Sequence, residues 1–329
     1  MLYKKLNLDK TSLGMLWLIV LVIFLFSVII PDKFLQITTF KSISYQLPEL
    51  GLLTLAMFIA MLSGGLNLSI ITTANITSLF MSWVFIKLIP HEAGILVQFL
   101  FLFIALSGAI LIATIIGCCS GFFITYIGIH PILVTLGVMT LLKGIGIWLT
   151  QGAAMSGIPK VLLEIGSGEF LGIPYLLILF LVIAYIVYIF LEKTSIGRCI
   201  YMSGSNINAT YFSGINTNKI TLIIYAVSNV LCVFAGLVMM ARFNSARMGY
   251  GDSYLLLTVL AIILGGANPL GGFGKVLNVV LALFVLQIIS TGLNLMGVSQ
   301  HLSLAMWGIA LIVTLIVRYF YNQYKSKIE

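Results

Sequence analysis

Charged residues are scarce in this sequence. Only 8% of the 329 residues are Asp, Glu, Lys or Arg, whereas 61% are hydrophobic and the mean hydropathy is +1.17. A soluble domain of this length cannot cover so much apolar side-chain surface with so few charges. The composition therefore excludes a soluble protein and predicts a polytopic membrane protein.

Cysteine and histidine are also few, and neither forms a recognisable motif. The sequence has no CxxC pair and no HExxH motif, and its four cysteines and three histidines are Cys118, Cys119, Cys199, Cys232, His91, His130 and His301. The cysteines lie in or beside apolar runs, as small buried hydrophobic residues do. A disulfide framework and a metal site are therefore not expected.

Two enzymatic motifs are missing as well. A phosphate-binding loop requires GxxxxGK[ST], but before Gly274-Lys275 the first Gly is replaced by Pro269, and Val276 replaces the hydroxyl residue. Neither Ser63 nor Ser120 stands in a GxSxG motif. The chain is not expected to be an enzyme or to bind ATP and Mg itself, so any ATP-driven activity requires a separate subunit.

Long apolar runs are abundant. Crossing a bilayer as a helix takes about 20 apolar residues, and on that measure we expect about ten spans. They fall near 13–30, 46–64, 69–90, 95–127, 131–151, 174–191, 218–241, 254–266, 275–297 and 301–321. The run 95–127 is overlong, and 254–266 is short enough to be a half-helix. The predicted fold is an all-α transmembrane helix bundle, a single domain over 1–329.

The 17 Lys and Arg residues exceed the 9 acidic ones, and their distribution indicates topology, not nucleic-acid binding. Ten spans place both termini on one side. On that side would lie Lys4, Lys5, Lys10, Lys193, Arg198, Lys219, Lys275, Arg318, Lys325 and Lys327. On the other would lie Lys33, Lys41, Lys87, Lys160, Arg242 and Arg247. The excess predicts that both termini and the segment 193–217 are cytoplasmic.

Two membrane-embedded stretches are interrupted by glycine. Met61–Ser69 (MLSGGLNLS) and Leu264–Lys275 (LGGANPLGGFGK) each join two spans without a hydrophilic loop. Lipid does not tolerate free backbone groups, so such breaks must line a cavity or pack against protein. One break in each half fits transporters built from repeated halves. An inverted repeat of 46–151 and 218–321 is therefore possible.

Residues 193–217 form the longest polar interruption in the chain. Within them, Ser205 or Asn206 could cap a short helix that ends at Gly214. Its apolar flank would consist of Ile207, Tyr211 and Phe212. A surface helix of this kind is suited to a groove on a partner protein. The alternative is an ordinary loop between two spans.

Polar residues in or beside the spans, all but one of them uncharged, are candidates for a solute pathway. The ones we select are Asn67, Ser69, Thr72, Asn75, Asp252, Asn268 and Asn294. Amide and hydroxyl groups suit a hydroxyl-rich solute, but the same groups also hydrogen-bond helices together in membranes, which is the alternative for about half of such residues. Two charges also occur in apolar runs. Glu49 either faces the bundle interior or a polar cavity, or lies at the outer interface, which is the interpretation we favour. Lys143 either pairs within the protein or contacts the solute.

Several motifs resemble one family. GLLTLAMFIAMLSGGLNLS, TSIGRCIYMSGSNINATYFSGINTNKI, LGGANPLGGFGKV and GLNLMGVS are similar to the permease subunits of sugar-type bacterial ABC importers, which include ribose, xylose, galactose and autoinducer-2 systems. The resemblance runs from about residue 46 to the end. It implies an inner-membrane permease that translocates a sugar or sugar-like solute. A stand-alone secondary transporter or facilitator is the alternative.

The resemblance further implies partners and roles. These would be cytosolic ABC ATPase subunits, an extracytoplasmic sugar-binding protein, membrane lipid and a second permease subunit, identical or paralogous. The segment 193–217 would contact the ATPase through residues that match the family pattern, namely Gly204, Asn206, Ala209, Ser213 and Gly214. The chain departs from the pattern at Ile207 and Tyr211, where Glu and Arg are common, and at Asn67, where Asp is usual. A paralogous partner that supplies this Asp would make a heterodimer.

Overall fold

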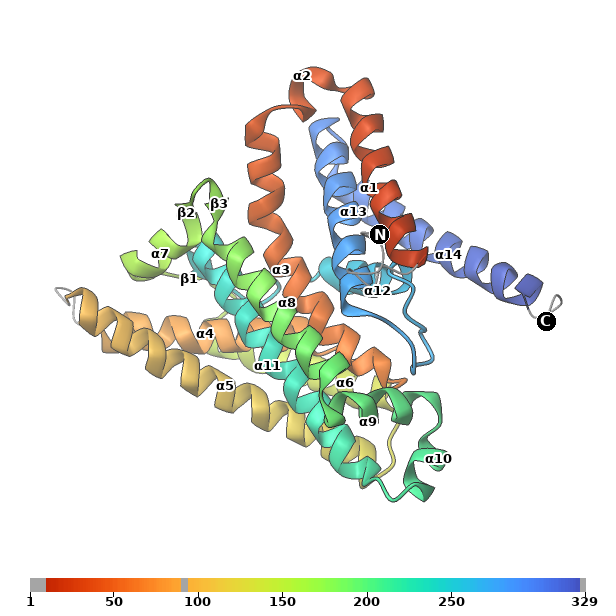
Figure 1. Cartoon of the computed structure of the whole chain (residues 1–329). Coiled ribbons are helices and arrows are strands. Elements are labelled where there is room, and N and C mark those ends of the chain that lie inside the picture. Colours follow the sequence, from red (N-terminus) through yellow and green to blue (C-terminus); the bar gives the residue numbers. More distant parts are fainter. Residues whose placement is uncertain (1–9, 90–93, 326–329) are drawn as a thin grey trace.

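The protein is a bundle of tilted helices, described by a computed structural model over residues 10–89 and 94–325 (Figure 1). Each of the ten predicted spans coincides with a helix. Eight of the described helices are long and apolar enough to cross a membrane, and the predicted half-helix is short, as expected. The all-α prediction is confirmed. Four of the residues named above lie outside the described ones, namely Lys4, Lys5, His91 and Lys327.

The elements follow one another along the chain with short connections. The long helices are α1 (Lys10–Ile29), α3 (Ile37–Leu62), α4 (Ile70–Leu88), α5 (Ile95–Thr125), α6 (Pro131–Thr150), α8 (Tyr175–Lys193), α11 (Thr217–Phe243), α13 (Val276–Leu295) and α14 (Gln300–Lys325). The short helices are α2 (Pro31–Phe34), α7 (Lys160–Ser167), α9 (Ser195–Ser205), α10 (Ile207–Phe212) and α12 (Tyr254–Leu264). Two antiparallel pairs complete the fold, β1 (Met155–Ser156) with β4 (Ser245–Ala246), and β2 (Glu169–Phe170) with β3 (Ile173–Pro174).

Helix α3 forms the centre of the bundle. In the most apolar stretch of α3, 89% of the residues are buried inside the protein, compared with 17% in the corresponding stretches of α1 and α5. Outward-facing apolar side chains on α1 and α5 suit contact with lipid. The sequence explains the tight packing of α5 against α11, because Ala105, Ala109, Ala113, Gly117 and Gly121 are buried at four-residue spacing. Such a small-residue face lets two helix backbones approach closely.

The contacts between helices are those expected of the repeat 46–151 and 218–321. Helix α3 contacts α12 and α13, α11 contacts α4 and α5, and α3 and α11 contact each other. Exchanging α3 with α11, α4 with α12 and α5 with α13 maps these contacts onto one another. Each repeat thus packs its first helix against the second and third helices of the other repeat.

One end of the bundle carries α9, α10 and both glycine breaks, while α2 and the β2–β3 hairpin lie at the opposite end (Figure 1). The first turns of α1 lie near the start of α13, since Ser12 Oγ donates a hydrogen bond to Asn278 Oδ1 at 2.6 Å. At the opposite end, Lys41 Nζ lies 2.8 Å from Glu169 Oε2 and ties α3 to the hairpin. We refer to these two ends as the α10 end and the α2 end.

Candidate functional site

A polar groove opens between α3, α12, α13 and α14. Its volume is about 260 Å³. Its polar lining consists of Gln46, Ser253, Tyr254, Ser290, Asn294 and Ser303, and Leu257, Val298, Leu304 and Trp307 supply the apolar part. None of these described lining residues is charged. Of the predicted pathway residues, Asn294 lines this groove.

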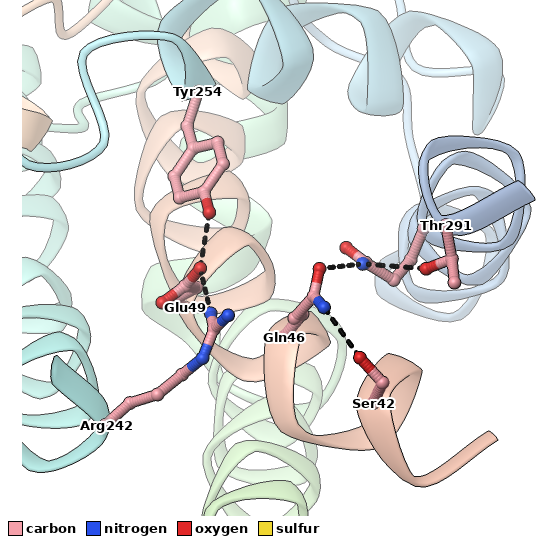
Figure 2. Close-up of polar contacts among 7 residues, drawn as sticks. Ser42, Gln46, Glu49, Arg242, Tyr254 and Thr291 are labelled. Carbon is pink, nitrogen blue, oxygen red and sulfur yellow. Dashed lines mark hydrogen bonds and ion pairs between the residues drawn. The ribbon is translucent and has the colours of Figure 1, made fainter. Parts of the chain in front are cut away.

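Gln46, which lines this groove, belongs to a chain of side-chain hydrogen bonds. Gln287 Nε2 donates to Gln46 Oε1 at 3.1 Å, and Gln46 Nε2 donates to Ser42 Oγ at 2.8 Å (Figure 2). Gln287 also lies 3.5 Å from Thr291 Oγ1. These bonds join α3 to α13 and fix the orientation of the Gln46 side chain, whose residue lines the groove.

Glu49 is completely buried, so its interpretation as a residue of the outer interface is wrong. Arg242 Nη1 donates to Glu49 Oε1 at 2.5 Å, and the Tyr254 hydroxyl donates to the same oxygen (Figure 2). A carboxylate at this depth is tolerated because a cation and a hydroxyl compensate its lost hydration. The sequence carried a partial signal. Ser42, Gln46 and Glu49 are spaced four and three residues apart and therefore share one face of α3.

Lys143 and Asp252 pair with each other. Their Nζ and Oδ2 atoms lie 2.7 Å apart, and both side chains are about half exposed. Of the two roles left open for Lys143, the structure shows pairing with the chain itself. Asp252 lines a second cavity of about 580 Å³, and Ser253 and Tyr254 line both cavities. Asp252 thus lies near the groove, with its charge compensated by Lys143.

The segment 193–217 folds into two short helices at the α10 end. Asn206 caps α10, because its Oδ1 accepts from Ala209 N at 3.0 Å, and Gly214 follows the helix with a φ of 81°. Ser213 Oγ donates to Ala209 O at 2.8 Å. The predicted capped helix is confirmed. Its apolar flank of Ile207, Tyr211 and Phe212 projects outward, and Phe212 is 85% exposed.

Gly204 does not share this exposed surface. A Cβ at Gly204 would overlap the carbonyl oxygen of Leu62 and lie 2.6 Å from Gly272 N. Gly272 N itself donates to Leu62 O at 2.9 Å, and Tyr201 Oη donates to Gly274 O at 2.8 Å. The end of α9 therefore packs backbone to backbone on both glycine breaks, and Gly204 faces the protein interior where a surface role was predicted.

Comparison with known proteins identifies the family. The family model described as "Branched-chain amino acid transport system / permease component" matches residues 39–315. The chain belongs to this permease family. It is a multi-pass protein of the bacterial inner membrane and a transport component, in agreement with its apolar helices and with the relatives it resembles.

Curated relatives of the permease are import components. It is 28% identical over 275 residues to the autoinducer 2 import system permease protein LsrD of Salmonella typhi, covering 82% of this chain and 80% of the relative. It is 29% identical over 302 residues to the ribose import permease protein RbsC of Haemophilus influenzae, covering 91% of this chain and 90% of the relative. The predicted resemblance to sugar-type importer permeases is confirmed. No solved structure matches the chain.

Four predicted pathway residues of the permease are buried in helix packing. Asn67 Nδ2 donates to Ser228 Oγ at 2.9 Å, and its Oδ1 accepts from Ser69 Oγ at 2.6 Å. Thr72 Oγ1 donates to Ser69 O at 3.0 Å, and Asn75 Nδ2 donates to Tyr250 O at 3.1 Å. Each of the four is at most 3% exposed. Asn67 and Asn75 thus connect α4 and the residues before it to distant parts of the chain, whereas Ser69 and Thr72 bond locally. All four side chains are hydrogen-bonded within the protein, which is the alternative that the sequence left open.

Asn268 also lies away from the groove. It belongs to the loop between α12 and α13, where its Oδ1 accepts from Leu270 N at 3.2 Å and its backbone N–H donates to Phe273 O at 2.8 Å. This loop packs against α9 at the α10 end. Asn268 therefore shapes a turn at the bundle end, far along α13 from Asn294. Within the described residues, no three His, Cys, Asp or Glu side chains cluster as a metal site requires.

Proposed function

We propose that this protein is the transmembrane permease subunit of a binding-protein-dependent ABC importer for a sugar or sugar-like solute. In this proposal residues 1–329 form one permease domain, and 193–217 is the segment through which a cytosolic ATPase moves it. The observation that carries the proposal is the capped helix α10, which presents exposed apolar side chains on an otherwise polar segment.

Helix α10 has the properties of a docking element. A six-residue helix is not stable alone, but the Asn206 cap and the following Gly214 define its ends. Tyr211 and Phe212 are 65% and 85% exposed. A short helix with exposed aromatic residues fits a groove on a partner, and aromatic anchors commonly dominate the binding energy of such contacts. We propose that the ATPase subunit is this partner and that it contacts Asn206, Ala209 and Ser213.

The groove favours an uncharged solute. Its lining offers amide and hydroxyl groups, and the charges around it are paired, Glu49 with Arg242 and Lys143 with Asp252. A hydroxyl-rich solute gains hydrogen bonds from such groups without competing with a fixed charge. The relatives named above import ribose and autoinducer 2 by their names. We therefore place the solute of this permease in the same hydroxyl-rich class.

Energy would come from other subunits. Since the sequence has no phosphate-binding loop, ATP and Mg would be bound by two ATPase subunits. A second permease subunit, identical or paralogous, would complete the pathway, and an extracytoplasmic binding protein would deliver the solute. Movement of α9 and α10 by the ATPases would reach the glycine breaks through the backbone contacts of Gly204.

The test is capture of a co-expressed ATPase subunit by the tagged permease. Phe212→Asp should lower the captured ATPase by about tenfold or more, as loss of an aromatic anchor does. Leu171→Asp is the matched control, because Leu171 is 89% exposed but lies at the α2 end, and capture should not change. Equal capture by both variants would contradict the proposal.

A second measurement, solute uptake by cells, tests the alternative function, a transporter that works alone. Cells that express the permease without an ATPase should not accumulate D-ribose, D-xylose or D-galactose. Accumulation in such cells that Phe212→Asp leaves unchanged would show instead a transporter that works alone.

A further inference from the structure

A third cavity lies on the outside of the bundle, away from the proposed solute groove. It is a groove of about 370 Å³ between α1, α8 and α13, at the point where α8 ends and α13 begins. Its wall is apolar and includes Leu181, Leu277 and Val280, and its rim carries Glu192, Lys193 and Lys275. We call it the rim-lysine groove. None of its lining residues belongs to the proposed solute groove or to α10.

The position of this groove matches the boundary between acyl chains and headgroups. Lys193 is the last residue of the apolar helix α8, and Lys275 immediately precedes the apolar helix α13. Lysines at the ends of spans lie at headgroup level. Tyr185 and Tyr188 line the same groove, and Lys193 Nζ lies 5.8 Å from the centre of the Tyr188 ring. Aromatic residues of this kind are typical of the same boundary.

The rim also holds a buried acceptor. Among the described residues, Glu192 Oε1 is buried without a hydrogen-bond partner. A buried carboxylate oxygen without a donor is costly, so a ligand that brings a hydroxyl group to Glu192 would be favoured. The described lining residues include two lysines and one glutamate, and the lysine ammonium groups complement a phosphate group.

We propose that the rim-lysine groove binds an anionic glycerophospholipid. An acyl chain lies along Leu181, Leu277 and Val280, the phosphate contacts Lys193 and Lys275, and a headgroup hydroxyl donates to Glu192 Oε1. Phosphatidylglycerol has all three features. Phosphatidylcholine has the chains and the phosphate but no hydroxyl donor and no net charge, so it serves as the comparison lipid. The site does not depend on the proposed transport function.

Native mass spectrometry of the purified full chain, exchanged into detergent with one lipid at a time, tests this site. The wild-type protein should retain phosphatidylglycerol in preference to phosphatidylcholine with the same acyl chains. Lys193→Gln and Lys275→Gln should each lower that retention by about fivefold. Lys219→Gln is the matched control, because Lys219 is exposed at the same end of the bundle but does not line the groove, and it should change nothing.

Two variants of Glu192 test the headgroup contact. Glu192→Gln keeps a side-chain oxygen that accepts a hydrogen bond, so phosphatidylglycerol retention should be preserved, whereas Glu192→Leu removes the acceptor and should lower it. The thermal unfolding of each variant shows whether it is folded. Equal retention of both lipids, or retention that survives the double lysine substitution, would overturn the proposal. So would a preference for phosphatidylethanolamine that Glu192→Gln abolishes, since this would assign Glu192 to an ammonium group.

Discussion

Arg242 Nη1 lies 2.5 Å from Glu49 Oε1, and this ion pair joins the last turn of α11 to the centre of α3. The two helices are the first members of the two predicted repeats. Because the Tyr254 hydroxyl donates to the same carboxylate oxygen, the pair also holds the first residue of α12, which lines the polar groove. One buried carboxylate thus joins three helices, and two of them, α3 and α12, border the polar groove.

Breaking this pair from one side should destabilise the permease strongly. Arg242→Met leaves the buried Glu49 without its cation, a change that costs about 3–5 kcal/mol in the free energy of unfolding. The double variant Glu49→Gln/Arg242→Met removes both charges and should recover most of that loss. Thermal unfolding of the detergent-purified variants measures the difference. A double variant no more stable than Arg242→Met would show that the charges are not coupled.

Gly204 should tolerate no side chain. In Gly204→Ala the new Cβ meets the backbone of Leu62 and Gly272, which cannot move aside as a side chain can. We expect lower thermal stability and loss of solute uptake. Gly144→Ala, also in a helix, is the control, because its Cβ meets nothing within 4 Å and alanine favours a helix over glycine by up to about 1 kcal/mol. If both variants behaved like wild type, the tight packing of α9 on the breaks would be refuted.

Local signals in the sequence predicted local structure well. The ten apolar runs became helices because a backbone in lipid must satisfy its own hydrogen bonds. Asn206 and Gly214 marked the ends of α10 because capping depends on neighbouring residues. The two glycine breaks were visible for the same reason, since few other residues adopt the φ values of 83° and 93° found at Gly64 and Gly271.

Partners distant along the chain could not be predicted. Asn67 is chemically suited to a solute, and only its contact with Ser228, 161 residues away, shows that its amide is already used. Glu49 has its partner Arg242 193 residues away, and no local pattern in the sequence links the two. The role of Gln46 in the groove could not be predicted, because an amide near the end of a span forms no distinctive sequence pattern. In each case the role depends on tertiary packing.

The ion pair between Lys41 and Glu169 should make the α2 end sensitive to acid. The hydrogen bond from Lys41 holds the pKa of the Glu169 carboxyl below its ordinary value. A lowered pKa contributes stability that is fully present above the unfolded pKa of about 4.3 and is lost as the pH falls through the folded value. The difference in unfolding temperature between wild type and Lys41→Gln should therefore be present at neutral pH and shrink below about pH 4. A difference that stays constant or grows in acid would contradict this ion pair.

Variants of Asn294 and Asn67 should distinguish a role in solute transport from a role in helix packing. Asn294 is exposed in the solute groove, so Asn294→Leu should lower uptake while thermal stability and ATPase capture stay at the wild-type level. Asn67 is fully buried, and Asn67→Leu leaves Ser228 and Ser69 without their amide partner, which should cost about 1–3 kcal/mol of stability. Uptake of D-ribose, D-xylose and D-galactose in cells, measured beside the unfolding temperature of each purified variant, distinguishes the two. Normal uptake in Asn294→Leu for every solute that the wild type transports would remove this groove from the pathway, because a leucine there both deletes the amide and narrows the cavity.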